Sequence, residues 1–144
     1  MMKKYTFILI AAAAVLAFVS CKKDASVAKP QVTLTEVGHE NSREAMRGDD
    51  LHLEADILAE GRISRIVVDI HREDGTFVIA KTFTEGKYVG VKNVAFHEHI
   101  DIPADAPLGA YLLQFTVTDR EGNTSLAEAH IHVIEYDEQA HHEE

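Results

Sequence analysis

Histidine is the residue type in this chain whose number and spacing indicate chemistry. The sequence contains nine histidines among 144 residues. His97 and His99 are separated by one residue in VAFHEHIDI (94–102). An extended backbone therefore places both on one face, with Cα atoms about 6–7 Å apart, and Asp101 continues that face. Imidazole nitrogens and carboxylate oxygens are ligands of zinc and copper, so this segment predicts one side of a transition-metal site.

A second segment supplies a matching row of polar residues. In LHLEADIL (51–58) the apolar residues alternate with His52, Glu54 and Asp56, which fall on the opposite face. In a β-sandwich these two strands pair, and their polar rows then lie side by side. Such rows supply about four ligands for one ion, with further carboxylates to orient the rings. The predicted zinc or copper ligands are His97, His99, His52, Glu54 and Asp101.

A second candidate cluster comes from histidines in other segments. One histidine is the last residue of RIVVDIH (65–71), and two occupy alternate positions in LAEAHIHVIEY (126–136). A fourth lies in the loop GHENSR (38–43), from which it can complete either this cluster or the first site. The residues of this second cluster are His71, His130, His132 and His39.

Other interpretations of these histidines stay open. An antiparallel sheet needs polar residues on its solvent face, and His serves there without binding anything. Imidazoles beside carboxylates also titrate near neutral pH and can act as pH sensors. Enzymatic activity is not expected: HEH lacks the helical spacing of the HExxH zinc peptidases. The chain also has no Ser or Cys nucleophile motif and no Gly-rich phosphate loop. Copper–zinc superoxide dismutase also has a His-x-His strand, but the similarity does not extend further, because a chain with a single Cys cannot form the disulfide of that enzyme.

Alternation with a period of two predicts the fold class. It recurs in seven segments: 32–37, 51–58, 65–71, 76–83, 94–102, 111–119 and 126–136. Turn residues separate them, and no segment after residue 20 has a helical period. This pattern predicts an all-β, immunoglobulin-like antiparallel β-sandwich of about seven strands over 31–136, with Tyr111 at a tyrosine corner. A small barrel is the alternative.

The N-terminal segment predicts location. Residues 1–20, MMKKYTFILIAAAAVLAFVS, have the positive start and apolar run of a secretory signal, and the only cysteine, Cys21, follows. We expect a lipoprotein signal peptide, a lipid attached at Cys21 and a tether over 21–30. The alternative is an ordinary cleaved signal with an incidental Cys. A transmembrane helix is not expected, because the apolar run is shorter than the roughly 20 residues needed to span a bilayer. The expected location is the outer membrane, facing the periplasm or exposed at the surface. Residues 137–144 are expected to form an acidic, His-containing tail.

The charge balance excludes one class of partner. The chain has 24 Asp and Glu against 14 Lys and Arg, a net charge of −10. Binding to nucleic acid needs a basic surface, so it is not expected. An acidic surface is compatible with cations as ligands, and equally with solubility alone.

Several stretches resemble a known family. GHENSR (38–43), GDDLHLEADI (48–57), IVVDIHRED (66–74), KNVAFHEHIDIPADAPLGAY (92–111) and FTVTDREGN (115–123) are similar, in order and spacing, to the small Bacteroides-type lipoproteins of domain of unknown function 4625. The resemblance implies one immunoglobulin-like lipoprotein domain, often rich in His, with no assigned activity. Leu112 and Gln114 stand where that pattern implies His, and Arg72 stands where it implies Pro.

Together these features lead to two hypotheses. The first is a lipid-anchored cell-envelope domain that binds zinc or copper through strand histidines, as an accessory to an outer-membrane transporter. The second is a non-enzymatic module without a metal that binds a surface protein or a glycan. His52, His97 and His99 distinguish them, because side chains more than about 8 Å apart cannot share one ion.

Overall fold

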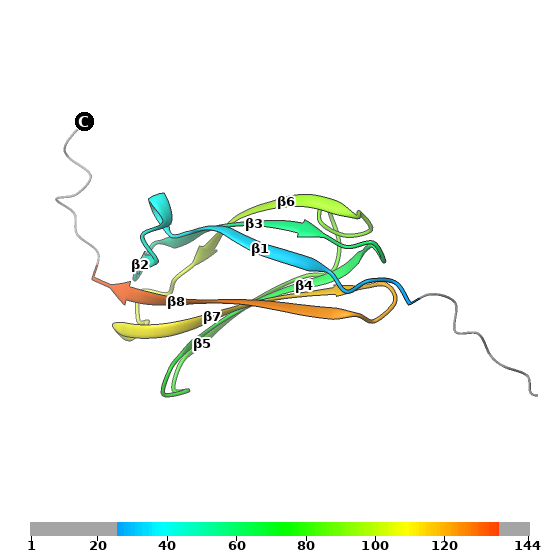
Figure 1. The fold of residues 1–144 in the computed structure, drawn as a ribbon. Coiled ribbons are helices and arrows are strands. Elements are labelled where there is room, and N and C mark those ends of the chain that lie inside the picture. The colour runs from blue at the N-terminus through cyan, green and yellow to red at the C-terminus, as the bar shows by residue number, and fades with distance from the viewer. Residues whose placement is uncertain (1–25, 136–144) are drawn as a thin grey trace, which may run out of the picture.

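The computed structural model describes residues 26–135, which form eight strands in two sheets (Figure 1). The first sheet has the order β1-β3-β6, and the second has the order β2-β8-β7-β4-β5. The strands of the first sheet are β1 (Gln31–Val37), β3 (Asp50–Leu58) and β6 (Asn93–Asp101). Those of the second are β2 (Glu44–Met46), β4 (Ile63–Arg72), β5 (Val78–Phe83), β7 (Gly109–Asp119) and β8 (Thr124–Ile134). The predicted signal peptide, Cys21 and the tail 137–144 lie outside the described residues.

The all-β prediction is confirmed, and the two sheets pack as a β-sandwich-like body. All seven predicted strands are present, with ends within two residues of those expected. The eighth, β2, has three residues and pairs with β8 in parallel. It is too short to show alternation, which is why the sequence pattern did not predict it. A single turn of 3-10 helix, η1 (His39–Asn41), precedes it. In the described part of the chain, no helix has the length and apolar character needed to cross a bilayer.

Alternation in the strands separates the core from the surface. In β3 the side chains of Leu51, Leu53, Ala55 and Ile57 are buried, while the residues between them face outward. Most buried side chains are Val, Ile or Leu. Phe96 and Phe115 meet across the two sheets, with ring centroids 4.9 Å apart. Because both sheets bury one face in this core, the outer faces are left to polar residues.

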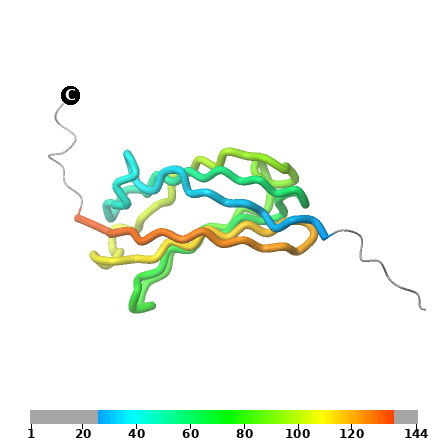
Figure 2. The backbone as a smooth tube through the Cα atoms, viewed as in Figure 1, coloured from blue at the N-terminus to red at the C-terminus, as the bar shows by residue number. Residues whose placement is uncertain are grey.

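Two hydrogen bonds fix the ends of the domain. The Tyr111 hydroxyl donates to the Pro107 carbonyl oxygen at 2.7 Å, which is the contact expected of a tyrosine corner. At the other end, the Asn123 side chain in the β7–β8 turn donates to the Val27 carbonyl oxygen at 3.2 Å. Part of the predicted tether is therefore held against the domain. Figure 2 shows the start of β1 and the β7–β8 turn at the same end, with the loop after β1 at the other.

Candidate metal centre

The antiparallel register of β3 and β6 brings three histidines together. His52 lies opposite His99, and Glu54 lies opposite His97, so the two predicted polar rows are adjacent. The ring centroid of His52 lies 4.8 Å from that of His97 and 5.1 Å from that of His99. One ligand nitrogen from each ring lies within 4.8 Å of the others. The three residues can therefore hold one metal ion.

Each of the three rings has a carboxylate at one of its nitrogens. His52 Nε2 donates to Glu54 Oε1 at 3.2 Å. His97 Nδ1 lies 3.4 Å from the same oxygen, so Glu54 joins two rings. His99 Nδ1 donates to Asp50 Oδ1 at 2.8 Å. One nitrogen of each imidazole is thereby oriented by a carboxylate, and the other remains for a ligand.

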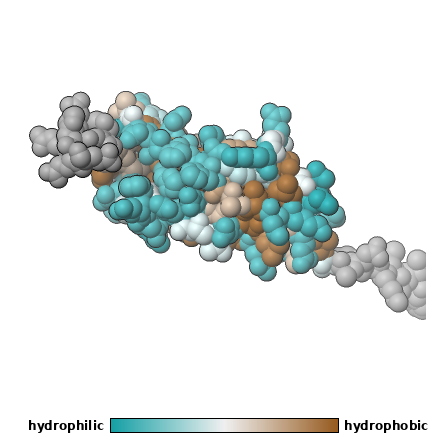
Figure 3. Space-filling view, turned by 90° about the horizontal axis from the view of Figure 1, so that it is seen from above, coloured by the Kyte–Doolittle hydropathy of each residue, from teal (hydrophilic) through white to brown (hydrophobic). Residues whose placement is uncertain are grey.

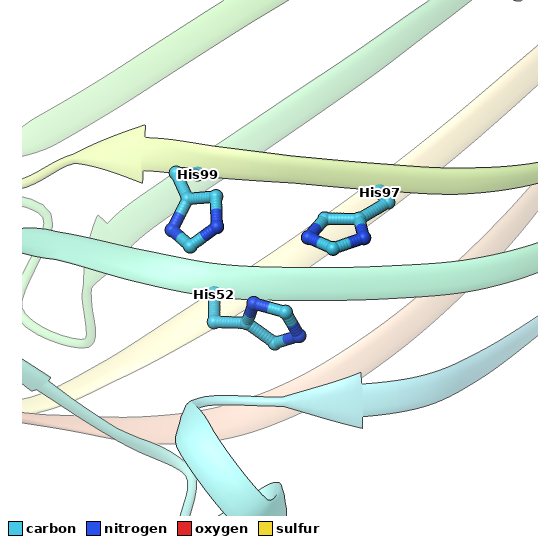
Figure 4. A group of neighbouring side chains, drawn as sticks. All are labelled: His52, His97 and His99. Atoms are coloured by element: carbon cyan, nitrogen blue, oxygen red, sulfur yellow. The ribbon is translucent and has the colours of Figure 1, made fainter.

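The free nitrogens converge. Figure 4 shows the three rings around a common space, with His99 and His97 directing a nitrogen toward each other from β6 and His52 directing one toward them from β3. Histidines that bind metals commonly donate the remaining ring N–H to a carboxylate or carbonyl, which fixes the ring and raises its basicity. The three rings already have this arrangement.

The site is open to solvent on one side. The His97 and His99 side chains are 54% and 53% exposed, whereas His52 is 18% exposed. The hydrogen bond to Asp50, with the charge of that carboxylate, raises the pKa of His99 above its ordinary value. Seen from the three-stranded sheet, hydrophilic residues cover the end of the face nearest the loop after β1, and apolar residues gather toward the other end (Figure 3). An ion can therefore reach the rings directly from solvent.

Glu36 also belongs to this site, and the sequence pattern did not indicate it. Its Oε2 lies 3.7 Å from His52 Nε2, and Glu36, His52 and Glu54 form a second group whose ligand atoms lie within 4.8 Å of one another. A register shift between Leu34 and Glu36 pairs Glu36 with Glu54. Such a bulge inserts one residue and redirects the side chains after it, so simple alternation cannot place this carboxylate.

A pocket of about 380 Å³ adjoins the histidines. His52, His99 and His39 of η1 all line it. Asp49 and Asp50 add acidic groups, and β2 supplies part of the lining. A second hollow of about 450 Å³ lies between the far ends of β1, β3 and β6, and no histidine lines it. Of these two hollows, the first is therefore the one associated with the candidate centre.

The remaining predicted residues lie elsewhere. Asp101 lies opposite Asp50, one outward position beyond the His52–His99 pair. In residues 26–135 it belongs to neither of the two groups whose ligand atoms lie close enough to share a metal ion. The second candidate cluster is not brought together either. His71 and His130 lie on opposite sides of Leu112, which pairs with both, so two strand spacings of about 4.8 Å separate their backbones.

Each of these outlying histidines has its own surroundings. His71 donates to Asp69 at 3.0 Å, and His130 donates to Glu73 at 3.1 Å. His132 lies opposite Glu44 of β2. His39 is the one member of the second cluster that lies beside the candidate centre, in the lining of its pocket.

Comparison with known proteins identifies the family. The model of the family described as Domain of unknown function (DUF4625) matches residues 19–134, so the chain belongs to that family. No curated protein matches the chain.

Two solved structures are similar to this chain at low sequence identity. Catalytically inactive OgpA from Akkermansia muciniphila, in complex with an O-glycopeptide, is similar with a TM-score of 0.53 and 13% identity, over 79% of this chain and 32% of that one. A family 123 glycoside hydrolase from Clostridium perfringens has a TM-score of 0.45 and 12% identity, over 76% of this chain and 28% of that one. This chain thus spans about a third of the length of either structure.

Proposed function

We propose that this member of the DUF4625 family binds one divalent transition-metal ion, zinc or copper, through His52, His97 and His99. One observation carries the proposal. Each ring has a carboxylate at one nitrogen, while the other nitrogens face a common space. A pair of histidines on a sheet surface does not need this arrangement, whereas a metal centre does.

The geometry is close to what an ion requires. Ligands at about 2.1 Å from a tetrahedral zinc lie about 3.4 Å apart. The ligand nitrogens here lie within 4.8 Å of one another, so side-chain movements of about 1 Å close the site, given those bond lengths. The exposed His97 and His99 can make such movements without disturbing the core.

The charges also favour a cation. Three neutral imidazoles leave the charge of a divalent ion uncompensated, and the carboxylates of Asp50, Glu36 and Glu54 surround them. Glu36 and Glu54 lie directly opposite each other, an arrangement of like charges that is unfavourable in a sheet. A bound cation relieves this repulsion, so the carboxylates stabilise the loaded state more than the empty one.

The setting that we propose is an immunoglobulin-like domain anchored by lipid at Cys21. The tyrosine-corner contact of Tyr111 and the two packed sheets support the immunoglobulin-like description. The chain enters the domain beside the β7–β8 turn, and β1 then runs seven residues, about 20 Å, toward the end that contains His52. An anchored domain would hold the metal centre away from the bilayer, where a transporter or another surface protein can exchange the ion.

Replacing Cys21 by Ser should move the protein from the membrane to the soluble fraction, and retention in the membrane would contradict the anchor.

Calorimetry with zinc and copper on protein without a His tag tests the metal proposal. We expect one ion per chain at about pH 7.5 and much weaker binding at about pH 5.5, because protons compete for the imidazoles. The His97→Ala/His99→Ala double variant should lose binding. The matched control, His71→Ala/His130→Ala, removes two histidines that also contact carboxylates and should bind normally.

The opposite results would favour the second hypothesis. Absence of binding, or equal losses in both double variants, would reject the site. The domain would then be a non-enzymatic interaction module, to be pursued by crosslinking on intact cells to find a protein or glycan partner.

A further inference from the structure

The geometry points to His39 as the fourth ligand of the proposed ion, supplied by the loop that joins β1 to β2. This inference rests on the proposed metal centre. Three histidines leave one position of a tetrahedral ion open, and a structural or storage site closes that position with a fourth protein ligand.

The pocket beside the centre limits the choice. Its wall combines His52 and His99 with only one further imidazole, that of His39. Asp50 is already the partner of His99. Glu44 and Asp49 are the other carboxylates of the wall, but a fourth imidazole suits a zinc or copper centre that already has three. His39 is exposed and lies outside the group of ligand atoms within 4.8 Å. Coordination therefore brings its side chain inward across the pocket.

The loop is connected to the centre by hydrogen bonds. The Gly38 N–H donates to the His52 carbonyl oxygen at 2.8 Å, so the base of the loop is tied to a ligand residue. The Glu40 N–H donates to Glu36 Oε1 at 2.8 Å, while the other oxygen of that carboxylate faces His52 Nε2. The residues on both sides of His39 are thus connected to His52, Gly38 through the His52 backbone and Glu40 through the Glu36 carboxylate.

The backbone of the loop is held in an unfavourable conformation. Glu40, Asn41 and Arg43 have φ angles of 52°, 58° and 59°, in the left-handed region that residues other than glycine rarely adopt. The Asn41 side chain maintains the turn by accepting the Val37 N–H at 3.0 Å. Three such residues within four positions cluster here, beside the proposed centre, and strain of this kind concentrates at binding sites. A loop poised in this way can change conformation when His39 gains a ligand bond.

Cobalt(II) absorption spectroscopy on the full chain tests the fourth ligand, because visible bands report the number and type of ligands. The variants are His39→Ala and His39→Gln, with His130→Ala as the control for loss of an exposed histidine. We expect both His39 variants to bind cobalt at least about tenfold more weakly, the range seen when a ligand or its support is lost, and to show shifted bands. Added imidazole should restore the spectrum of His39→Ala and leave that of the unaltered protein unchanged.

Other outcomes reject the inference in distinguishable ways. If the His39 variants keep the spectrum and affinity of the unaltered protein, and imidazole shifts the bands of the unaltered protein, the fourth position is open and His39 is not a ligand. If the unaltered protein binds neither cobalt nor zinc, the metal centre itself is rejected, and this inference with it. Far-ultraviolet circular dichroism and thermal unfolding of the metal-free variants show whether the loop change has disturbed the fold.

Discussion

Glu54 should control metal affinity although it need not touch the ion. Its Oε1 lies 3.2 Å from His52 Nε2 and 3.4 Å from His97 Nδ1, so one carboxylate orients two of the three rings. With a metal–nitrogen bond of about 2.1 Å at the other nitrogen of the imidazole, this oxygen lies about 7 Å from the ion. A unit charge at that distance from a divalent ion contributes about 1.2 kcal/mol at the dielectric constant of water, or about sevenfold in affinity.

Two substitutions separate the charge from the orientation. Glu54→Gln keeps a hydrogen-bond acceptor and removes the charge, so it should weaken binding about sevenfold. Glu54→Ala also releases both rings and should approach the hundredfold loss known for the partners of metal-bound histidines. Asp56→Asn is the matched control, because it removes the same charge from the same face of β3, one outward position farther along. Calorimetry at moderate salt gives the dissociation constants, and equal effects of Glu54→Gln, Glu54→Ala and Asp56→Asn would refute the reasoning.

Three further outcomes are expected. Tyr111→Phe should lower the free energy of unfolding in urea by about 1 kcal/mol through loss of one buried hydrogen bond, and an unchanged value would show that the corner contributes nothing. Tyr88→Phe should lower the free energy of unfolding by about 1–3 kcal/mol, because the Tyr88 hydroxyl donates to the His97 carbonyl oxygen and accepts from the His97 N–H. Urea unfolding of the variant and of the unaltered protein measures this loss, and a loss no greater than that of Tyr111→Phe would argue against this pairing. In the metal-free protein, NMR titration should give His99 a pKa above its ordinary 6.5, with a lower pKa after Asp50→Asn. A group whose pKa is higher in the folded than in the unfolded protein stabilises the fold at pH values below its unfolded pKa, and this stabilisation is lost as the pH rises through its folded pKa. Asp50→Asn should therefore lower the free energy of unfolding at about pH 5.5 and leave it unchanged at about pH 8.5.

The polar rows of β3 and β6 could be predicted because they depend only on alternation and on strand order. Buried residues at every second position of β3 force His52 and Glu54 outward, and the same rule applies to His97 and His99. Once these strands pair, the rows must be adjacent. The exact partners depend on register, which the turn geometry and the hydrophobic pattern fix together.

The carboxylates that complete the site could not be predicted by the same rule. Glu36 reaches His52 because of the bulge in β1, and a bulge leaves no periodic signal. Asp50 precedes the alternating segment 51–58, yet it is the first residue of β3 and hydrogen bonds to His99. The sequence predicts Asp101 as a ligand instead, because it continues the row of His97 and His99. It lies opposite Asp50, and it is Asp50 whose carboxylate contacts His99.

Contact with a carboxylate does not by itself distinguish the candidate centre. In a chain with 24 acidic residues, His71 and His130 on the other sheet also hydrogen bond to Asp or Glu. What separates the two sets is the position of the second nitrogen. Leu112 lies between His71 and His130, and neither belongs to a ligand group within 4.8 Å in residues 26–135, whereas His52 lies directly across from His99. Convergence of the unoccupied nitrogens, rather than the number of histidines or their acidic partners, is therefore the property on which metal binding should depend.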